Sequence, residues 1–191
     1  MNNQTEPPAM ASGWRVSNRV FLWLAVMVIV LTWAMLIIAY PALPARIPGH
    51  FDLSGVPDAM VARSWWIVFL PGMLQIVLTI GLAWLSGHPE YSNLPIGLAL
   101  RLVSEPTQGK IKRLIAHLLV MTSLIIDLIM AYISLAVIQV GLGLAERLNS
   151  WAVLSLIGFL LLLVIVYSVW VARLTRRVRS VDSDLSGRMT R

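Results

Sequence analysis

The chain has 191 residues, of which 58% are apolar and 13% charged, and its formal net charge is +6. Because soluble domains carry roughly 25% charged residues, this composition indicates an integral membrane protein of one domain. The sequence contains no cysteine, which excludes disulfides, thiolate metal sites and cysteine nucleophiles. The positive charges flank apolar segments without interleaved aromatic residues, so we expect them to meet membrane lipids and not nucleic acid.

Four apolar segments predict an all-α, polytopic membrane protein, with four transmembrane helices in a bundle and a structured extracytoplasmic loop after the first helix. About 20 apolar residues cross a ~30 Å hydrocarbon core as a helix. The predicted spans are residues 20–40, 65–85, 114–140 and 151–171. They belong to a transmembrane domain over 20–172, between a disordered cytoplasmic tail, 1–19, and a basic cytoplasmic tail, 173–191.

The loop between the first two spans, 41–64, is rich in turn-forming residues. Four prolines fix the φ angle within it, and Gly49 and Gly55 accompany them. These prolines are Pro41, Pro44, Pro48 and Pro57. The composition predicts a stiff loop of defined shape, and we expect this loop to take part in the function of the protein.

Two further features interrupt the apolar pattern. Pro71-Gly72 lies inside the second span, where a proline is predicted to bend the helix. The polar connection 87–112 contains a semi-apolar stretch, 94–103, which is a candidate for a short helix along the membrane interface.

The distribution of lysine and arginine predicts the orientation of the chain. Four spans place both termini and the second loop on one side, and these segments hold twelve of the 15 positive residues. Arg46, Arg63 and Arg147 are the three on the other side. By the positive-inside rule, both termini are cytoplasmic and the proline-rich loop faces outward.

The outward loop carries a motif of nine residues at fixed spacings. Leu43-Pro44, Ile47-Pro48, His50-Phe51, Gly55 and Pro57-Asp58 resemble the signature of a bacterial family, domain of unknown function 1648. A second motif, formed by Pro89, Tyr91, Asn93 and Pro95, is similar to one that these proteins often carry after their second span. The resemblance implies a helical bundle of the bacterial inner membrane, related to the N-terminal part of SdpI-type immunity proteins for a sporulation-delaying toxin.

His50 is the first candidate for chemistry, because Asp52 and Asp58 lie near it in the stiff loop. Imidazole and carboxylate suit a proton-linked ligand site or a zinc ion. The alternative is that His50 and Asp58 hydrogen-bond to the loop backbone and hold its shape. One histidine and two aspartates make a thin ligand set, so no metal site is predicted. The candidates for ligand or partner binding are Pro44, Pro48, His50, Phe51, Asp52, Gly55, Pro57 and Asp58.

Asp127 is the second candidate, because an ionised carboxylate near the middle of a span costs at least ~2.5–3.5 kcal/mol. Ser123 and Ser134 lie on the same helix face and complete an intramembrane polar stripe. The stripe predicts either a proton relay or polar path, or an Asp127 that ties helices together by hydrogen bonds. Gln75 and Thr79, which share a face of the second span, are its predicted partners in the bundle.

Two further groups are assigned to the membrane surface. His117 begins the third span and lies about 80° from the Asp127 stripe, which predicts a position at the interface. Four arginines directly follow the fourth span, where lipid binding and topology account for them and a cytoplasmic regulator is the alternative partner. They are Arg173, Arg176, Arg177 and Arg179.

These features predict a non-enzymatic protein with no catalytic residues, no cofactor and no metal. The expected role is recognition of an extracytoplasmic peptide or protein, signalling, or toxin immunity, and a homo-oligomer is left open. The alternative is a dimeric small transporter or transporter subunit, with the Asp127 stripe as its path and Pro71-Gly72 as its hinge. An intramembrane enzyme would need paired catalytic groups at one depth, and only Asp127 lies deep.

Overall fold

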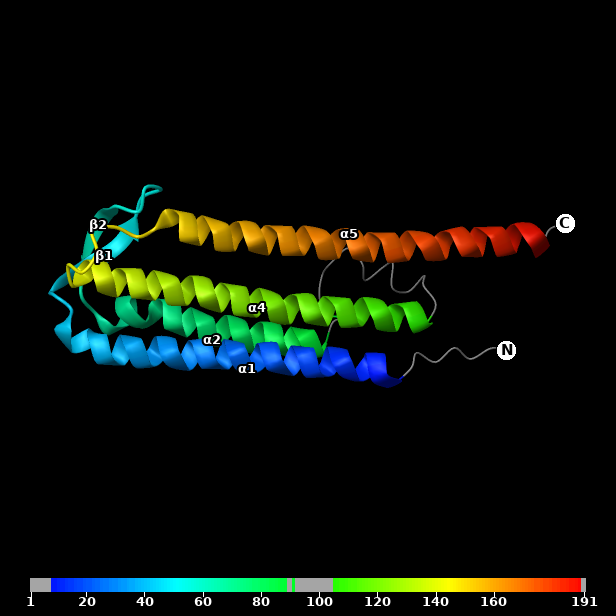
Figure 1. Cartoon of the computed structure of the whole chain (residues 1–191), viewed down its shortest axis with the longest axis horizontal. Helices are drawn as coiled ribbons and strands as arrows, with labels where there is room; N and C mark the ends of the chain where they lie inside the picture. Colours follow the sequence, from blue (N-terminus) through cyan, green and yellow to red (C-terminus); the bar gives the residue numbers. More distant parts are fainter. Residues whose placement is uncertain (1–7, 89–90, 92–104, 190–191) are drawn as a thin grey trace.

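The computed structural model describes residues 8–88, 91 and 105–189, and four long helices lie side by side within them (Figure 1). They are α1 (Pro8–Ala39), α2 (Trp65–Gly87), α4 (Glu105–Gly141) and α5 (Ser150–Met189). Each contains a segment long and apolar enough to cross a membrane, which confirms the predicted four-span helical fold. The predicted interfacial helix, 94–103, and three residues of the second motif, Pro89, Asn93 and Pro95, lie outside the described residues.

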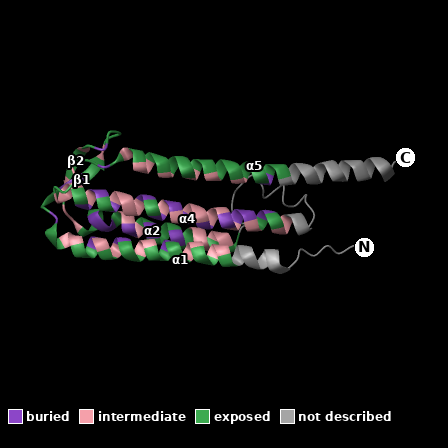
Figure 2. Ribbon diagram, in the orientation of Figure 1, coloured by how far each residue is buried: buried purple, intermediate pink, exposed green. Residues whose placement is uncertain are grey.

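α4 is the central helix of the bundle. It packs against α1, α2 and α5, and in Figure 1 it lies between α5 and the other two helices. Over residues 150–173, whose side chains the structure describes, most of α5 outside this contact is exposed, as the colours of Figure 2 show. Lipid tails are as apolar as leucine, so exposed apolar faces are expected of helices that face a bilayer.

The helices extend beyond the predicted spans, which corrects the predicted tails. α1 begins at Pro8, so residues 8–19 are helical and not disordered, and α5 continues to Met189 through most of the basic tail. α4 begins at Glu105, well before the predicted start at residue 114. Proline is compatible with the first turn of a helix, because its missing N–H has no partner there anyway. Polarity alone does not end a helix that is already nucleated in the membrane.

The loop between α1 and α2 is a β-hairpin, a local detail that the prediction of a structured loop in a helical protein did not include. Strands β1 (Arg46–Phe51) and β2 (Pro57–Ala62) pair in antiparallel fashion. The register is irregular at two places, which leaves Gly49 and Asp58 as extra residues in bulges. Prolines and bulges weaken the alternating pattern by which a strand is recognised in a sequence, so the loop reads as a series of turns.

A hydrophobic core at the hairpin end of the bundle joins the hairpin to the helices. Its fully or nearly buried members are Leu36, Leu43, Ile47, Val68, Phe69 and Ile138. Two ring pairs cover this core: Trp33 with Phe69, whose centroids lie 5.3 Å apart, and Tyr40 with Trp65, at 4.1 Å. Full burial of a side chain such as Ile47 contributes about 1.5–3 kcal/mol. The hairpin is therefore a fixed part of the bundle.

Arg63 ties the end of β2 to the end of α1. Its Nη1 atom donates a hydrogen bond to the carbonyl oxygen of Leu43 and another, 3.2 Å long, to that of Tyr40. Its guanidinium carbon lies 5.1 Å from the centroid of the Tyr40 ring. These carbonyls belong to the 3-10 turn η1 (Tyr40–Ala42) and the residue after it. Carbonyls at the C-terminal end of a helix lack intrahelical partners and carry partial negative charge, so a cation is favourable there.

Candidate functional site

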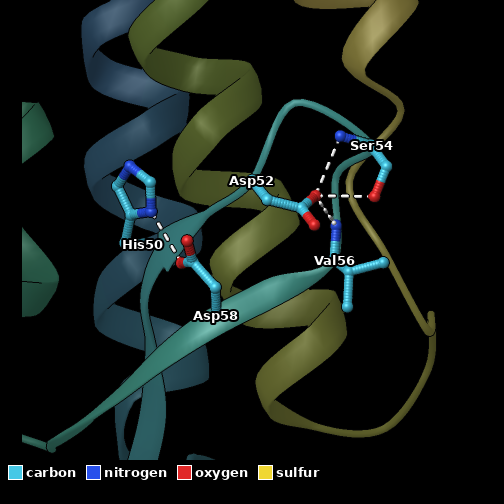
Figure 3. A network of polar contacts seen from close by, with 5 residues as sticks. All are labelled: His50, Asp52, Ser54, Val56 and Asp58. Atoms are coloured by element: carbon cyan, nitrogen blue, oxygen red, sulfur yellow. Dashed lines mark hydrogen bonds and ion pairs between the residues drawn. The ribbon is translucent and has the colours of Figure 1, made fainter.

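The tip of the hairpin is a turn built around Asp52. Its Oδ1 atom accepts hydrogen bonds from the backbone N–H groups of Ser54 (2.8 Å) and Val56 (2.9 Å) and from the Ser54 hydroxyl (2.7 Å), as Figure 3 shows. The backbone N–H of Gly55 donates to the Asp52 carbonyl at 2.9 Å, and the φ angle of Gly55 is +85°. Aspartate at the first position and glycine at the fourth favour such a turn.

We expect part of the stability of the hairpin to be lost in acid because of Asp52. The hydrogen bonds from the Ser54 hydroxyl and the Val56 N–H hold the pKa of Asp52 below its ordinary value of 3.8. When the folded-state pKa is depressed, the stabilisation is complete above the unfolded pKa and is lost as the pH falls through the folded one. Thermal unfolding in detergent should therefore show an acid limb below pH 3.8 that is shallower in Asp52→Asn, which cannot titrate. An identical limb in the two proteins would contradict this role of Asp52.

His50 and Asp58 face each other across the hairpin and are both exposed to solvent. Nδ1 of His50 lies 2.6 Å from Oδ1 of Asp58 (Figure 3), and 69% and 46% of the respective side chains are exposed. In place of the expected bonds to the loop backbone, the two side chains bond to each other. The bulge at Asp58 makes this possible, because it inserts that residue beside the pair His50 and Ala59. An exposed pair of this kind adds little stability, so it is available to a ligand.

An apolar pocket of about 380 Å³ lies beneath the hairpin tip. Residues 49–53 form one wall, and Ile133 of α4 together with Val153, Leu154 and Ile157 of α5 form the other. His50 and Asp52 bring polar groups to this lining. The volume and the mixture of apolar walls with few polar groups are typical of small-ligand sites.

A second pocket, of about 760 Å³, shares four lining residues with the first: Leu53, Leu148, Ser150 and Leu154. Arg147 adds a positive charge to it, and Trp151 adds an aromatic side chain that is 78% exposed. The Oγ atom of Ser150 is buried and has no hydrogen-bond partner within the described part of the chain. The two pockets together therefore offer a ligand apolar walls, the positive charge of Arg147 and the polar groups of His50 and Asp52.

The hairpin tip is anchored to the loop between α4 and α5. The backbone N–H of Leu148 donates to the Gly55 carbonyl at 2.8 Å. A β-carbon added to Gly55 would lie 1.9 Å from the Leu148 carbonyl oxygen. Only glycine at position 55 therefore allows the two backbones to approach each other this closely. This junction sets the position of the wall shared by both pockets.

The loop residues that the sequence proposed for ligand binding fall into two groups in the structure, those at the pocket and those that do not line it. His50, Phe51 and Asp52 line the first pocket, and Asp58 lies beside His50. Pro48 and Gly55 are buried, Pro57 pairs with Phe51 in the hairpin, and Pro44 is exposed but lines neither pocket. The last four residues therefore shape the loop.

Sequence reasoning missed the half of the site that α4, α5 and their connecting loop supply. Ile133, Leu148 and Leu154 look like any other apolar residues of a span or its end, so they carry no signal of their own. Leu53 does carry one, because it is an apolar residue in a polar turn and is 91% exposed.

A separate polar cluster lies inside the bundle and joins α1, α2 and α4. Thr79 Oγ1 donates to Oδ2 of Asp127 at 2.7 Å and lies 3.0 Å from Ser123 Oγ. Gln75 Nε2 donates to the Asp127 carbonyl at 2.8 Å and to Thr32 Oγ1 at 3.3 Å. All five side chains are buried. The structure thus places both Gln75 and Thr79 against Asp127.

The remaining candidates lie apart from both sites. Ser134 is buried, but its hydroxyl donates to the Met130 carbonyl of its own helix at 2.9 Å. His117 is nearly buried and bonds to Asn18 of α1, so it joins two helices. Its position at the membrane interface stays a prediction. Arg173 is exposed on α5. The side chains of Arg176, Arg177 and Arg179 lie outside the described residues.

Comparison with known proteins identifies the segment of the chain around the hairpin. Residues 27–74 match the family model described as domain of unknown function (DUF1648), which confirms the predicted family. The matched segment comprises the second part of α1, the hairpin and the first part of α2. No curated protein and no solved structure gives a match. The relation to SdpI-type immunity proteins stays a prediction.

Proposed function

We propose that this multi-pass membrane protein, whose residues 27–74 carry the domain of unknown function DUF1648, recognises an amphipathic peptide at the outer face of the bacterial cytoplasmic membrane. The observation that carries the proposal is the apolar pocket beneath the hairpin, with the exposed His50–Asp58 pair beside it. The hairpin belongs to the matched segment, so the proposal assigns recognition to the part shared with the family. The protein then acts by binding and not as an enzyme.

Charge distribution supports a hairpin that faces outward. The start of α1 and the end of α5 lie at one end of the bundle, and the hairpin lies at the other (Figure 1). The segments before residue 20, from residue 88 to 113 and after residue 172 hold twelve of the 15 lysine and arginine residues. Because positive residues are retained in the cytoplasm, both termini are cytoplasmic in this proposal.

The position of the pockets supports an amphipathic ligand. Val153, Leu154 and Ile157 lie in the first turns of a membrane span, so the apolar pocket opens at the level where a membrane-active peptide inserts its apolar face. Arg147 lies in the adjoining pocket, where it suits an acidic group or a terminal carboxylate of the same peptide. Binding there supports either a sensing role or protection against a toxic peptide.

The transporter alternative has less support from the geometry. A path along the polar stripe needs a group that a solute can reach, and Asp127 is 0% exposed. Thr79 and Gln75 bond to it from the facing helix, and both are themselves buried. The pockets of about 380 and 760 Å³ lie at the hairpin instead.

Photo-crosslinking tests the recognition proposal. A photoreactive residue in place of Leu53, which lines both pockets, should capture an extracytoplasmic peptide in native membranes. The matched control is the same residue in place of Ile38, which is 78% exposed on α1 and should capture lipid alone. Adding His50→Ala should weaken capture at Leu53 several-fold, since a contact to a polar side chain contributes about 1 kcal/mol.

Two results would count against recognition at the hairpin. One is capture of lipid alone at Leu53, as at Ile38. The other is a peptide adduct at Leu53 that His50→Ala and Asp58→Ala leave at the wild-type level, which would place binding away from this pair.

A further inference from the structure

The polar cluster around Asp127 has more hydrogen-bond acceptors than donors. The Thr79 hydroxyl donates its hydrogen bond to Oδ2 of Asp127, and the Thr32 hydroxyl donates its own to the Val28 carbonyl at 2.8 Å. With the Thr79 proton committed, the contact between Ser123 and Thr79 uses the proton of Ser123. The amide group of Gln75 points at the Asp127 carbonyl and at Thr32. No donor of this cluster is left over.

Two buried acceptor atoms remain without a partner within the described residues. They are Oδ1 of Asp127 and Oε1 of Gln75, and both side chains are 0% exposed. A buried acceptor without a donor costs about 1–3 kcal/mol, and a buried unpaired charge costs more. The cluster therefore lacks a hydrogen-bond donor. With an ionised Asp127 it would also lack a positive charge to balance the carboxylate.

No ionisable side chain of the described residues lies at this depth to supply that charge. On α4 the nearest side chain that can carry a positive charge is His117, about 15 Å along the helix, and Lys110, Lys112 and Arg113 are about 20 Å or more away. Tyr132, about 8 Å away, cannot become a cation. α2 carries no charged residue in its length, and the arginine of α1 nearest to Thr32 is Arg19, about 20 Å along the helix. The first ionisable residue of α5 is Tyr167, and Arg173 is the next. The charged groups of the hairpin lie at the end of the bundle (Figure 1).

We infer that Asp127 is a proton-binding site, which holds a proton on Oδ1 as a neutral carboxylic acid. The bound proton removes the charge and adds the one donor that the cluster lacks. Oδ2 remains the acceptor for Thr79, so the neutral acid links α4 to α2 without exposing a charge to the membrane interior. The inference is independent of ligand recognition at the hairpin.

Infrared difference spectroscopy of the full chain in lipid vesicles at neutral pH tests this inference. Wild type minus Asp127→Asn should show the C=O stretch of a protonated carboxylic acid that shifts in deuterium oxide. Asp127→Asn should melt close to wild type, because its neutral amide supplies a donor, whereas Asp127→Ala should melt at a clearly lower temperature. Thr79→Val keeps the acid but removes its partner, so it should move the C=O band to higher frequency.

The opposite spectrum would overturn the inference. If the difference shows the paired bands of an ionised carboxylate, then a water molecule or a metal ion satisfies Asp127 and no proton is stored there. A C=O band that Thr79→Val leaves in place would show that the protonated group is not the one that bonds to Thr79. This variant also keeps the test decisive if Asp127→Asn does not fold.

Discussion

Gly55→Ala is expected to destabilise the protein more than alanine at any other glycine that the structure describes. The new β-carbon would lie 1.9 Å from the Leu148 carbonyl oxygen and would face backbone that cannot turn aside. The φ angle of +85° adds strain for any residue with a side chain. Backbone strain and overpacking each cost about 1–3 kcal/mol, so we expect the free energy of unfolding to fall by roughly 3 kcal/mol or more. Thermal unfolding in mild detergent measures this change.

Gly143→Ala is the matched control. Gly143 also has a positive φ, +70°, but a β-carbon there meets no atom within 4 Å. Its replacement should therefore show the strain alone, at about 1 kcal/mol. If the two variants unfold alike, the close approach of Gly55 to Leu148 does not hold the hairpin tip on the loop between α4 and α5.

Arg63→Ala is expected to have the second largest effect. The substitution removes the hydrogen bonds to the Leu43 and Tyr40 carbonyls and the contact with the Tyr40 ring. Hydrogen bonds from a charged group contribute about 1.5–3 kcal/mol, and the substitution leaves the Leu43 and Tyr40 carbonyls without their bonds from the guanidinium group. We expect a loss of about 2 kcal/mol in the free energy of unfolding, measured in the same detergent.

Two companion variants separate the causes of this loss. Arg46→Ala removes an exposed arginine at the paired end of β1, where a surface change is expected to stay within about 0.5 kcal/mol. Arg63→Lys keeps the charge but loses the planar fork of donors, so it should recover only part of the stability. Equal unfolding of Arg46→Ala and Arg63→Ala would show that loss of a positive charge, and not the carbonyl contacts, explains the effect.

The hairpin shows how far sequence reasoning reaches at the site. The motif from Leu43 to Asp58 located the loop and its polar residues, because all of its residues lie at fixed spacings within one short stretch of the chain. The strands escaped notice, since Pro48, Gly49 and Pro57 are unfavourable inside a strand. The spacing of Asp52 and Gly55 was the available signal, because it is typical of a turn that closes a hairpin.

Asp127 shows the complementary case. Its position in an apolar span marks it as exceptional, and helix periodicity correctly places Ser123 on the same face. Periodicity does not state which helix faces that stripe. The predicted partner Thr79 lies 48 positions away in the chain, and the packing of α2 against α4 brings its hydroxyl to Oδ2 of Asp127.

The sequence by itself determined the number of spans and the family of residues 27–74, because hydropathy over about 20 residues and a motif of fixed spacing are local properties. The tertiary structure alone decided that α5 lies along α4, that Leu148 meets Gly55, and that pockets form between them. The physical reason is that lipid is as apolar as the helices themselves. Their rotation and neighbours therefore depend on close packing and on a few buried polar contacts, which the hydrophobic pattern does not record.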